Sequence, residues 1–215
     1  MGKEVKKLNV ESRKSVKWSL TLCFINFLLF PFYSFAQSDS GYVHKGILSA
    51  AGTIAIGDMP ENNLTNAYLT GDIEYYAEKT ISFRGDVYLF LNSLNQTTSL
   101  LYKNDALYFG AFYHIPTHSH FDPVIGFQPG ISYTQVLVGD PYGGYPGVGP
   151  DVATICPLAS GVLGINYFAV KWFHIEVNVR YTIGEHLTAA DETNISELSF
   201  NFGLGFNFDV RKKKK

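Results

Sequence analysis

Charged residues are scarce in this chain, and neither sign predominates. Asp, Glu, Lys and Arg make up 17% of the 215 residues, and the formal net charge is −2. Soluble domains typically carry roughly 25% charged residues. The balance of charge gives no basic surface for nucleic acid and no acidic tract of the kind found in disordered tails. The composition therefore excludes nucleic acid as an expected partner and favours one domain rich in apolar surface.

Cysteines and long apolar runs are also rare. The chain has two cysteines, Cys23 and Cys156, and its longest apolar run covers about residues 20–32. That run is shorter than the roughly 20 residues of a spanning helix, and Pro31 interrupts its end, which disfavours a membrane anchor. A lysine-rich lead precedes the run, and small residues follow it up to Ala36. We therefore predict a signal peptide over 1–36, cleaved near Ala36, so that Cys156 remains with no partner for an intramolecular disulfide.

Aromatic residues, in contrast, are abundant, and the last stretch before the tail shows how they are arranged. In residues 196–210 every second residue is large and apolar, and the residues between them are polar or small. The apolar positions are Leu198, Phe200, Phe202, Leu204, Phe206, Phe208 and Val210. A period of two predicts a β-strand with one apolar face. The apolar face is long enough for the 9 to 11 residues with which a tilted strand crosses a bilayer.

Seven earlier stretches share this length and alternation. They cover residues 46–56, 67–77, 81–91, 105–115, 123–135, 157–167 and 171–183. Short connections (78–80, 116–122 and 168–170) alternate with long ones (57–66, 92–104, 136–156 and 184–195). Alternating short turns and long loops are typical of outer-membrane barrels, where they are periplasmic and extracellular respectively. The expected domains are thus a periplasmic lead (37–45), a barrel (46–210) and a basic periplasmic tail (211–215).

Alternation alone does not say which face points inward. A soluble lipocalin-like ligand-binding barrel would have the same pattern, with the apolar face inside. Three features favour an apolar exterior: the low charge, the length of the apolar band, and tyrosines at both ends of the apolar face. Those tyrosines are Tyr75, Tyr113, Tyr167, Tyr133 and Tyr181. We therefore predict an all-β fold, an eight-stranded antiparallel transmembrane up-and-down β-barrel with two aromatic belts at the membrane interfaces.

The strand count, loop alternation, signal peptide and aromatic last strand resemble those of the small eight-stranded outer-membrane barrels, the class of the outer membrane protein A transmembrane domain. The resemblance covers residues 46–210. It implies location in the cell outer membrane, contact with its lipid, and recognition of residues 196–210 by the outer-membrane assembly machinery. In that family the last strand commonly ends on an aromatic residue, whereas here Phe208 is followed by Asp209, Val210 and the basic tail.

Charged residues within the predicted strands all lie on the polar face, and we expect them to form a network in the lumen. They are Asp72, Glu74, Arg84, Asp86, His174, Glu176 and Arg180. A turn centred on Lys79 places Glu74 opposite Arg84, and it places Asp72 opposite Asp86, a like-charged pair that would require a cation such as Arg180. On this basis we expect exchanging Glu74 and Arg84 to preserve their pairing. An eight-stranded barrel is just filled by its own side chains. The interior is therefore expected to be a polar plug, with a gated narrow pore as the alternative.

Other residue combinations were weighed as sites. His118, His120 and Asp122 form the one metal-like group, but they lack a further cysteine or carboxylate, so no metal or other cofactor is expected. His186 with Glu185 or Asp191 lacks a serine at recognisable spacing, so the protein is not expected to be an enzyme. Tyr142 and Tyr145, in the Gly-rich and Pro-rich loop of residues 139–150, are candidate extracellular contacts.

These observations lead to a hypothesis about function. We expect an outer-membrane barrel with a structural or adhesin-like surface role and a largely plugged interior. The first alternative is a narrow pore or passage for small solutes, including apolar ones. The second alternative is the soluble ligand-binding barrel.

Overall fold

The computed structural model of the chain describes residues 41–95, 101–117, 119–138, 149–150, 153–187 and 192–211. The predicted signal peptide, His118, Tyr142 and Tyr145 lie outside these residues. The described ranges include no helix that is long and apolar enough to cross a membrane.

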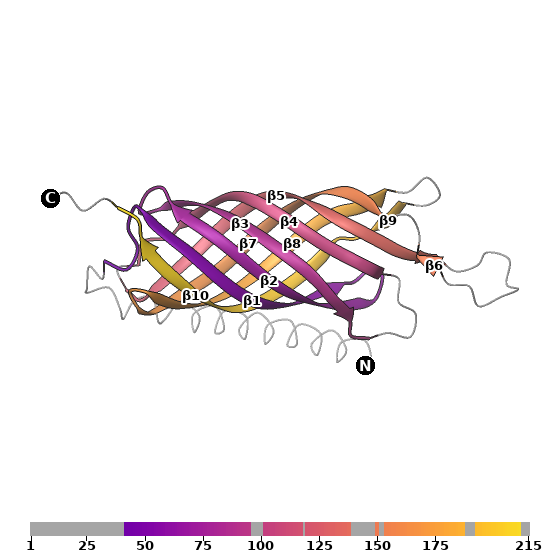
Figure 1. Cartoon of the computed structure of the whole chain (residues 1–215), viewed down its shortest axis with the longest axis horizontal. Helices are drawn as coiled ribbons and strands as arrows, with labels where there is room; N and C mark the ends of the chain where they lie inside the picture. Colours follow the sequence, from indigo (N-terminus) through magenta and orange to yellow (C-terminus); the bar gives the residue numbers. More distant parts are fainter. Residues whose placement is uncertain are drawn as a thin grey trace, which may run out of the picture. The chain divides into compact units, whose positions relative to one another are not determined.

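The described chain is built from antiparallel β-strands (Figure 1). The long strands are β1 (Ile47–Met59), β2 (Leu64–Tyr76), β3 (Ile81–Ser93), β4 (Leu101–His114), β5 (Phe121–Val138), β7 (Thr154–Val170), β8 (Phe173–Leu187) and β10 (Glu197–Asp209). Each pairs with the next long strand along the chain, and β10 pairs with both β8 and β1. The eight long strands therefore close into an up-and-down barrel, as predicted.

Two short strands continue the wall of the barrel beyond the closed ring. β6 (Gly149–Pro150) pairs with the end of β5, and β9 (Glu192–Asn194) pairs with residues 185–187 of β8. Both lie at the end opposite to the short turns (Figure 1). Ile47 of β1 is paired with Asp209 of β10, so the barrel begins and ends at the short-turn end. All eight predicted strands are confirmed, and most of them extend further at the long-loop end.

One predicted long loop is in fact a tight turn. Residues 57–66 were expected to form a loop, but β1 continues to Met59 and β2 starts at Leu64. The Asn62 N–H donates to the Met59 carbonyl at 3.2 Å, and Asn63 has a φ of 50°. Asparagine tolerates this left-handed backbone conformation better than most residues. Asn63 therefore closes a turn within a segment whose composition resembles that of a longer loop.

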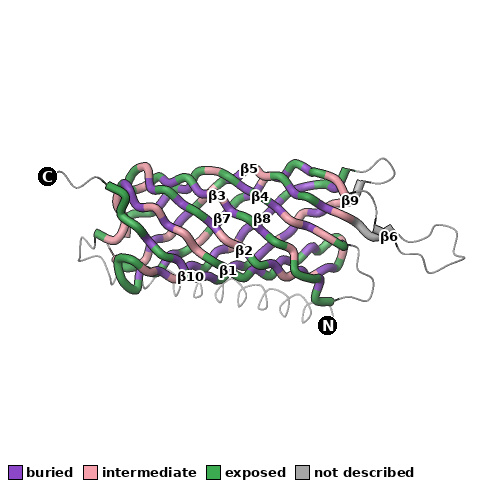
Figure 2. The backbone as a smooth tube through the Cα atoms, viewed as in Figure 1, coloured by how far each residue is buried: buried purple, intermediate pink, exposed green. Residues whose placement is uncertain are grey.

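The two faces of the strands have opposite environments, visible as alternating buried and exposed positions in Figure 2. The charged residues Glu74, Arg84 and Arg180 are 1 to 2% exposed, whereas Ile73, Phe109 and Phe202 are 59 to 63% exposed. The polar face therefore lies inside and the apolar face outside. This arrangement contradicts the soluble lipocalin-like alternative, which needs its apolar face inward.

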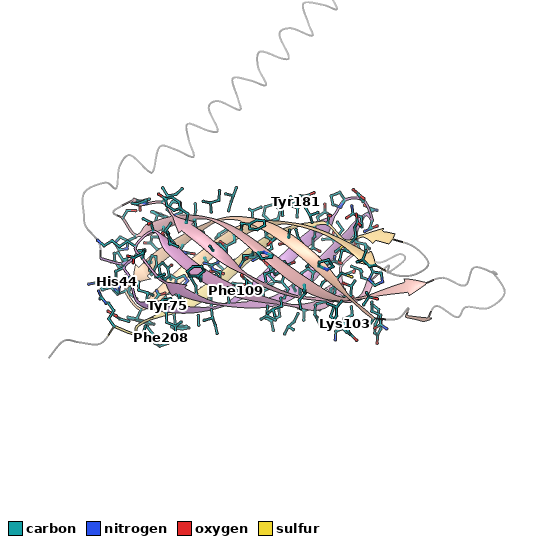
Figure 3. All side chains as sticks on the ribbon, turned by 90° about the horizontal axis from the view of Figure 1, so that it is seen from above. His44, Tyr75, Lys103, Phe109, Tyr181 and Phe208 are labelled. Carbon is teal, nitrogen blue, oxygen red and sulfur yellow. The ribbon has the colours of Figure 1, made fainter. Side chains whose placement is uncertain are left out.

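The tyrosines on the apolar face form the predicted two groups. Tyr75, Tyr113, Tyr167, Tyr133 and Tyr181 are all between 39 and 52% exposed. In Figure 3 Tyr75 and Phe208 lie towards the end that carries His44, and Lys103 lies towards the opposite end. Trp172, in contrast, was expected on the inner face of β8 but lies in the turn before it. Its ring is 60% exposed and stacks on Phe206, with ring centroids 6.1 Å apart, because β8 starts only at Phe173.

Candidate functional site

The short-turn half of the lumen contains a layer of buried ionisable side chains, here called the charged belt. Its acids and bases come from β2, β3, β4, β5 and β8, and all are between 1 and 7% exposed. They are Asp72, Glu74, Asp86, Asp122, Glu176, Arg84, Arg180 and His114. Strand alternation places them in the lumen, because each occupies an inward position of its strand. Buried charges on this scale require close partners.

Arg84 connects three carboxylates near the centre of the belt. Its Nη2 donates to Glu74 Oε2 at 2.7 Å, Nη1 lies 3.6 Å from Glu176 Oε2, and Nε lies 4.0 Å from Asp72 Oδ1. The register of β2 and β3 pairs Glu74 with Arg84 and Asp72 with Asp86, as the turn centred on Lys79 predicts. The guanidinium carbon also lies 4.5 Å from the centroid of the Phe112 ring. Arg84 therefore joins β2, β3, β4 and β8 across the lumen.

Arg180 is the second cation that crosses the lumen. Its Nη2 lies 3.1 Å from Asp86 Oδ1, so it compensates the pair of facing aspartates as predicted. Its Nε donates to the Tyr88 hydroxyl at 3.0 Å, and its Nη1 donates to Ser160 Oγ at 2.8 Å. The Tyr108 ring lies below the guanidinium at 4.3 Å, a distance that suits a cation–π contact. Arg180 is thus held on every side.

His114 lies at the short-turn edge of the belt between two carboxylates. Its Nδ1 is 2.8 Å from Asp122 Oδ2, and its Nε2 is 3.3 Å from Glu74 Oε1. Ser82, which hydrogen-bonds to Glu74, also lies 2.8 Å from Nε2. Acceptors on both sides suit an imidazole that carries a proton on each nitrogen. With that charge, the belt holds five carboxylates and three cations.

Glu176 and His174 of β8 are less completely satisfied than the rest. Oε2 of Glu176 and Nδ1 of His174 are buried and make no hydrogen bond. The His174 ring packs against Phe168, and a side chain at the facing Gly205 would collide with it. Glu176 retains its ion pair with Arg84. These two groups are the least tightly constrained of the predicted lumen residues.

Above the charged belt, towards the long loops, the lumen is lined by three tyrosines, here called the tyrosine layer: Tyr68, Tyr88 and Tyr108. Neighbouring rings meet edge to face, with centroids 5.7 and 5.5 Å apart. The Tyr68 hydroxyl donates to Glu197 Oε2 at 2.7 Å and accepts from Asn104 at 3.0 Å. This half of the interior is thus mainly apolar, with Glu197 as its buried carboxylate.

The candidate metal residues do not converge. His120 Nδ1 donates to the Phe168 carbonyl at 2.7 Å, whereas the Asp122 carboxylate accepts from His114 and from Asn166. His118 is outside the described residues. Within the described ranges there is no group of three histidine, cysteine or acidic side chains that could hold a metal ion. Cys156 is a buried free thiol, 3.9 Å from His186 Nδ1.

Several members of the network were missed at the level of sequence. His114 and Asp122 were considered only as metal candidates, and Gln128, Ser160 and Glu197 were not considered. Gln128 is fully buried and hydrogen-bonds to both the Arg84 carbonyl and Asp86. The signal that could have found them is the inward parity of β4, β5, β7 and β10, applied to every polar residue and not only to those in the clearest strands.

The fold is that of the small eight-stranded outer-membrane barrels. The N-terminal barrel domain of Pseudomonas aeruginosa OprF superposes with a TM-score of 0.56 at 11% identity, covering 77% of this chain and 99% of that domain. Neisserial surface protein A gives 0.56 at 13% identity, covering 76% and 96%. The outer membrane protein OprG of Pseudomonas aeruginosa gives 0.56 at 12%, covering 81% and 100%. No protein-family model matches the chain, and no curated protein matches its sequence.

Proposed function

We propose that this protein is a non-catalytic outer-membrane barrel with a closed interior, which acts through the surface at its long-loop end. The observation that carries this proposal is the pair of arginines across the lumen. Arg84 and Arg180 are 1 and 2% exposed and bind side chains of strands on different sides of the barrel. A path for ions through this layer would require these contacts to break, which is costly for buried charges.

The outer surface supports a location in the bilayer. Large apolar side chains cover the outside of every long strand, and tyrosines lie near both ends of the barrel. An apolar band flanked by aromatic belts fits the hydrocarbon layer and its two interfaces. In the proposed scheme the signal peptide is cleaved near Ala36, both barrel termini are periplasmic, and the assembly machinery recognises β10.

The long-loop end supports a role at the cell surface. β6 and β9 extend the wall beyond the closed ring there, whereas two residues connect β7 and β8 at the other end. In the proposed orientation this larger end is extracellular. Tyr142 and Tyr145, in the loop between β5 and β7, remain the proposed contacts with a surface partner.

Labelling of intact cells tests the orientation. A membrane-impermeant maleimide should react with Glu61→Cys, in the β1–β2 turn, and not with the matched variant Lys79→Cys, in the β2–β3 turn. Both positions are exposed, and the native Cys156 is buried. Labelling of Lys79→Cys in cells with an intact outer membrane, without labelling of Glu61→Cys, would reverse the proposed topology.

Recording in planar lipid bilayers tests the closed interior. The purified protein should show no steady single-channel conductance. Replacing both lumen arginines, Arg84→Ser with Arg180→Ser, should produce small resolvable steps, because the belt loses its two largest cross-links. Steady conductance of the unaltered protein would support the narrow-pore alternative instead.

A further inference from the structure

The wall of the barrel has one incomplete seam among its described strands, between β3 and β4. Their backbone ladder runs from Ile81 opposite Tyr113 to Tyr88 opposite Ala106 and stops there. Yet β3 continues to Ser93, and β4 starts at Leu101. The other neighbouring long strands remain laddered into their long-loop halves. We call the facing segments 89–93 and 101–105 the β3–β4 seam (β3 and β4 in Figure 1).

Both strands bulge at the level of the seam. On the β2 side, Tyr68 pairs with Phe90 and Ala67 with Asn92, so Leu91 is an extra residue in β3. On the β5 side, Tyr102 is an extra residue in β4, because Val136 and Gln135 pair with Leu101 and Lys103. A bulge bends its strand and increases the local twist. The two bulges therefore account for strands that stay paired to their outer neighbours while their shared ladder ends.

A side chain spans the seam where ladder bonds would otherwise lie. Oδ1 of Asp105 accepts the Phe90 N–H at 2.9 Å. Oδ2 of the same carboxylate lies 3.1 Å from Lys103 Nζ, which in turn lies 4.9 Å from the centroid of the Tyr133 ring. A bond of this kind to one carboxylate can break without disturbing a ladder. Asp105 therefore acts as a latch across the seam.

A cavity lies directly inside the seam. The last ladder pair, Tyr88 and Ala106, belongs to its lining, together with Tyr68, Asn104, Tyr108 and Glu197. About 280 Å³ between these walls contains no atom, part of it open to solvent, and only a water-sized portion is clear of the surrounding side chains. A larger occupant therefore requires the wall to move. The seam is where movement breaks the fewest backbone hydrogen bonds.

The cavity lining indicates what kind of molecule it would accept. The tyrosine layer offers ring edges and faces, Ala106, Leu158 and Ile195 add apolar contact, and the buried Glu197 carboxylate accepts hydrogen bonds. Below the cavity the Arg180 guanidinium packs on Tyr108 and closes the way to the charged belt. These features fit an uncharged aromatic ring with one hydroxyl donor.

We propose that the cavity behind the β3–β4 seam binds small phenol-like molecules, which enter sideways from the apolar layer around the barrel when the Asp105 latch releases. Entry from a bilayer rests on the membrane location proposed above. The site itself goes beyond that proposal, because it requires neither conduction through the lumen nor a surface partner. Its occupant passes through the wall of the barrel and not along its axis.

Photolabelling with 4-azidophenol tests the site on the full mature protein in lipid vesicles, in a Cys156→Ala background. We expect label on cavity residues, located by mass spectrometry, and competition by unmodified para-cresol. A disulfide between Leu91→Cys and Lys103→Cys, positions that would face each other if the ladder continued, should abolish the label, and reduction should restore it. The matched control is a disulfide between Leu107→Cys and Ile131→Cys, a laddered pair of β4 and β5, which should leave the label unchanged.

The latch gives a second, independent measurement. Asp105→Ala should increase labelling at limiting probe by up to about tenfold, the equivalent of one hydrogen bond, whereas Lys103→Met, which leaves the Asp105 carboxylate in place, should increase it less. Label confined to residues outside the cavity, or label that survives the seam disulfide, overturns the proposal. If that disulfide does not form, unchanged labelling of Asp105→Ala overturns it. Silence in planar bilayers concerns the closed interior alone, so the two proposals fail separately.

Discussion

Arg84 and Glu74 lie opposite each other in β3 and β2, with Nη2 of the arginine 2.7 Å from Oε2 of the glutamate. Replacing the arginine, Arg84→Met, leaves Glu74, Asp72 and Glu176 buried without their shared cation. We expect a loss of about 3 to 5 kcal/mol in the free energy of unfolding, as for other broken buried pairs. Denaturant unfolding in lipid vesicles measures it. Arg211→Met, which removes a fully exposed ion pair with Asp209, is the control and should cause no measurable change.

Exchanging the two residues, Glu74→Arg with Arg84→Glu, should not restore stability, although facing positions alone suggested that it would. The glutamate introduced at position 84 would lie beside Asp72 and Glu176, and the arginine introduced at position 74 would lie beside His114. Like charges then replace each attractive contact. The exchanged protein should unfold at a lower denaturant concentration than the unaltered protein. Equal midpoints would mean that water screens the belt.

Phe202 lies on the outside of β10 and is 59% exposed. If it faces hydrocarbon near the bilayer midplane, Phe202→Arg should cost about 2 to 4 kcal/mol, and Phe208→Arg, at the end of the same strand, about 0 to 1 kcal/mol. The depth dependence is the informative result, measured by unfolding from vesicles. Two small and equal effects would indicate that this face meets water.

Gly126 of β5 provides space for the ring that supports Arg84. A Cβ atom at Gly126 would lie 2.5 to 2.7 Å from three carbons of Phe112. Gly126→Ala should therefore displace the ring and cost about 1 to 3 kcal/mol of unfolding free energy, the usual range for overpacking. Gly161→Ala is the matched control, because nothing lies within 4 Å of its added methyl group. A neutral Gly126→Ala would show that the Phe112 ring can shift freely.

The short-turn end carries an exposed pair whose titration can be followed. Lys45 Nζ donates to Glu78 at 2.6 Å, and this hydrogen bond raises the pKa of Lys45 above its ordinary value. Because the folded-state pKa is raised, the stabilising effect is present at neutral pH and is lost as the pH rises through the folded pKa. NMR titration of ¹³C-methylated lysines should show the raised pKa, and Glu78→Gln should return it towards normal. High salt should reduce the shift; a shift that persists in Glu78→Gln would have another cause.

Much of the fold follows from periodicity. Alternation in residues such as those of β3 and β10 located the strands, and the turn centred on Lys79 fixed which residues of β2 and β3 face each other. Local composition failed at Asn63, where four turn-forming residues look like part of a longer loop, and at Trp172, where the strand starts one residue later than the alternation suggested. Strand ends depend on neighbours that a local pattern does not contain.

The sequence by itself determined the number of strands, their two faces, and the pairs within one hairpin, because these depend on a period of two and on short turns. Only the tertiary structure decided that the charged face is inside, since alternation is the same for both orientations. It also decided that Arg180 of β8 reaches Asp86 of β3 and that His114 of β4 lies between Glu74 and Asp122. Contacts across the lumen, and the end of the ladder between β3 and β4, depend on how all eight strands tilt and bend when the barrel closes.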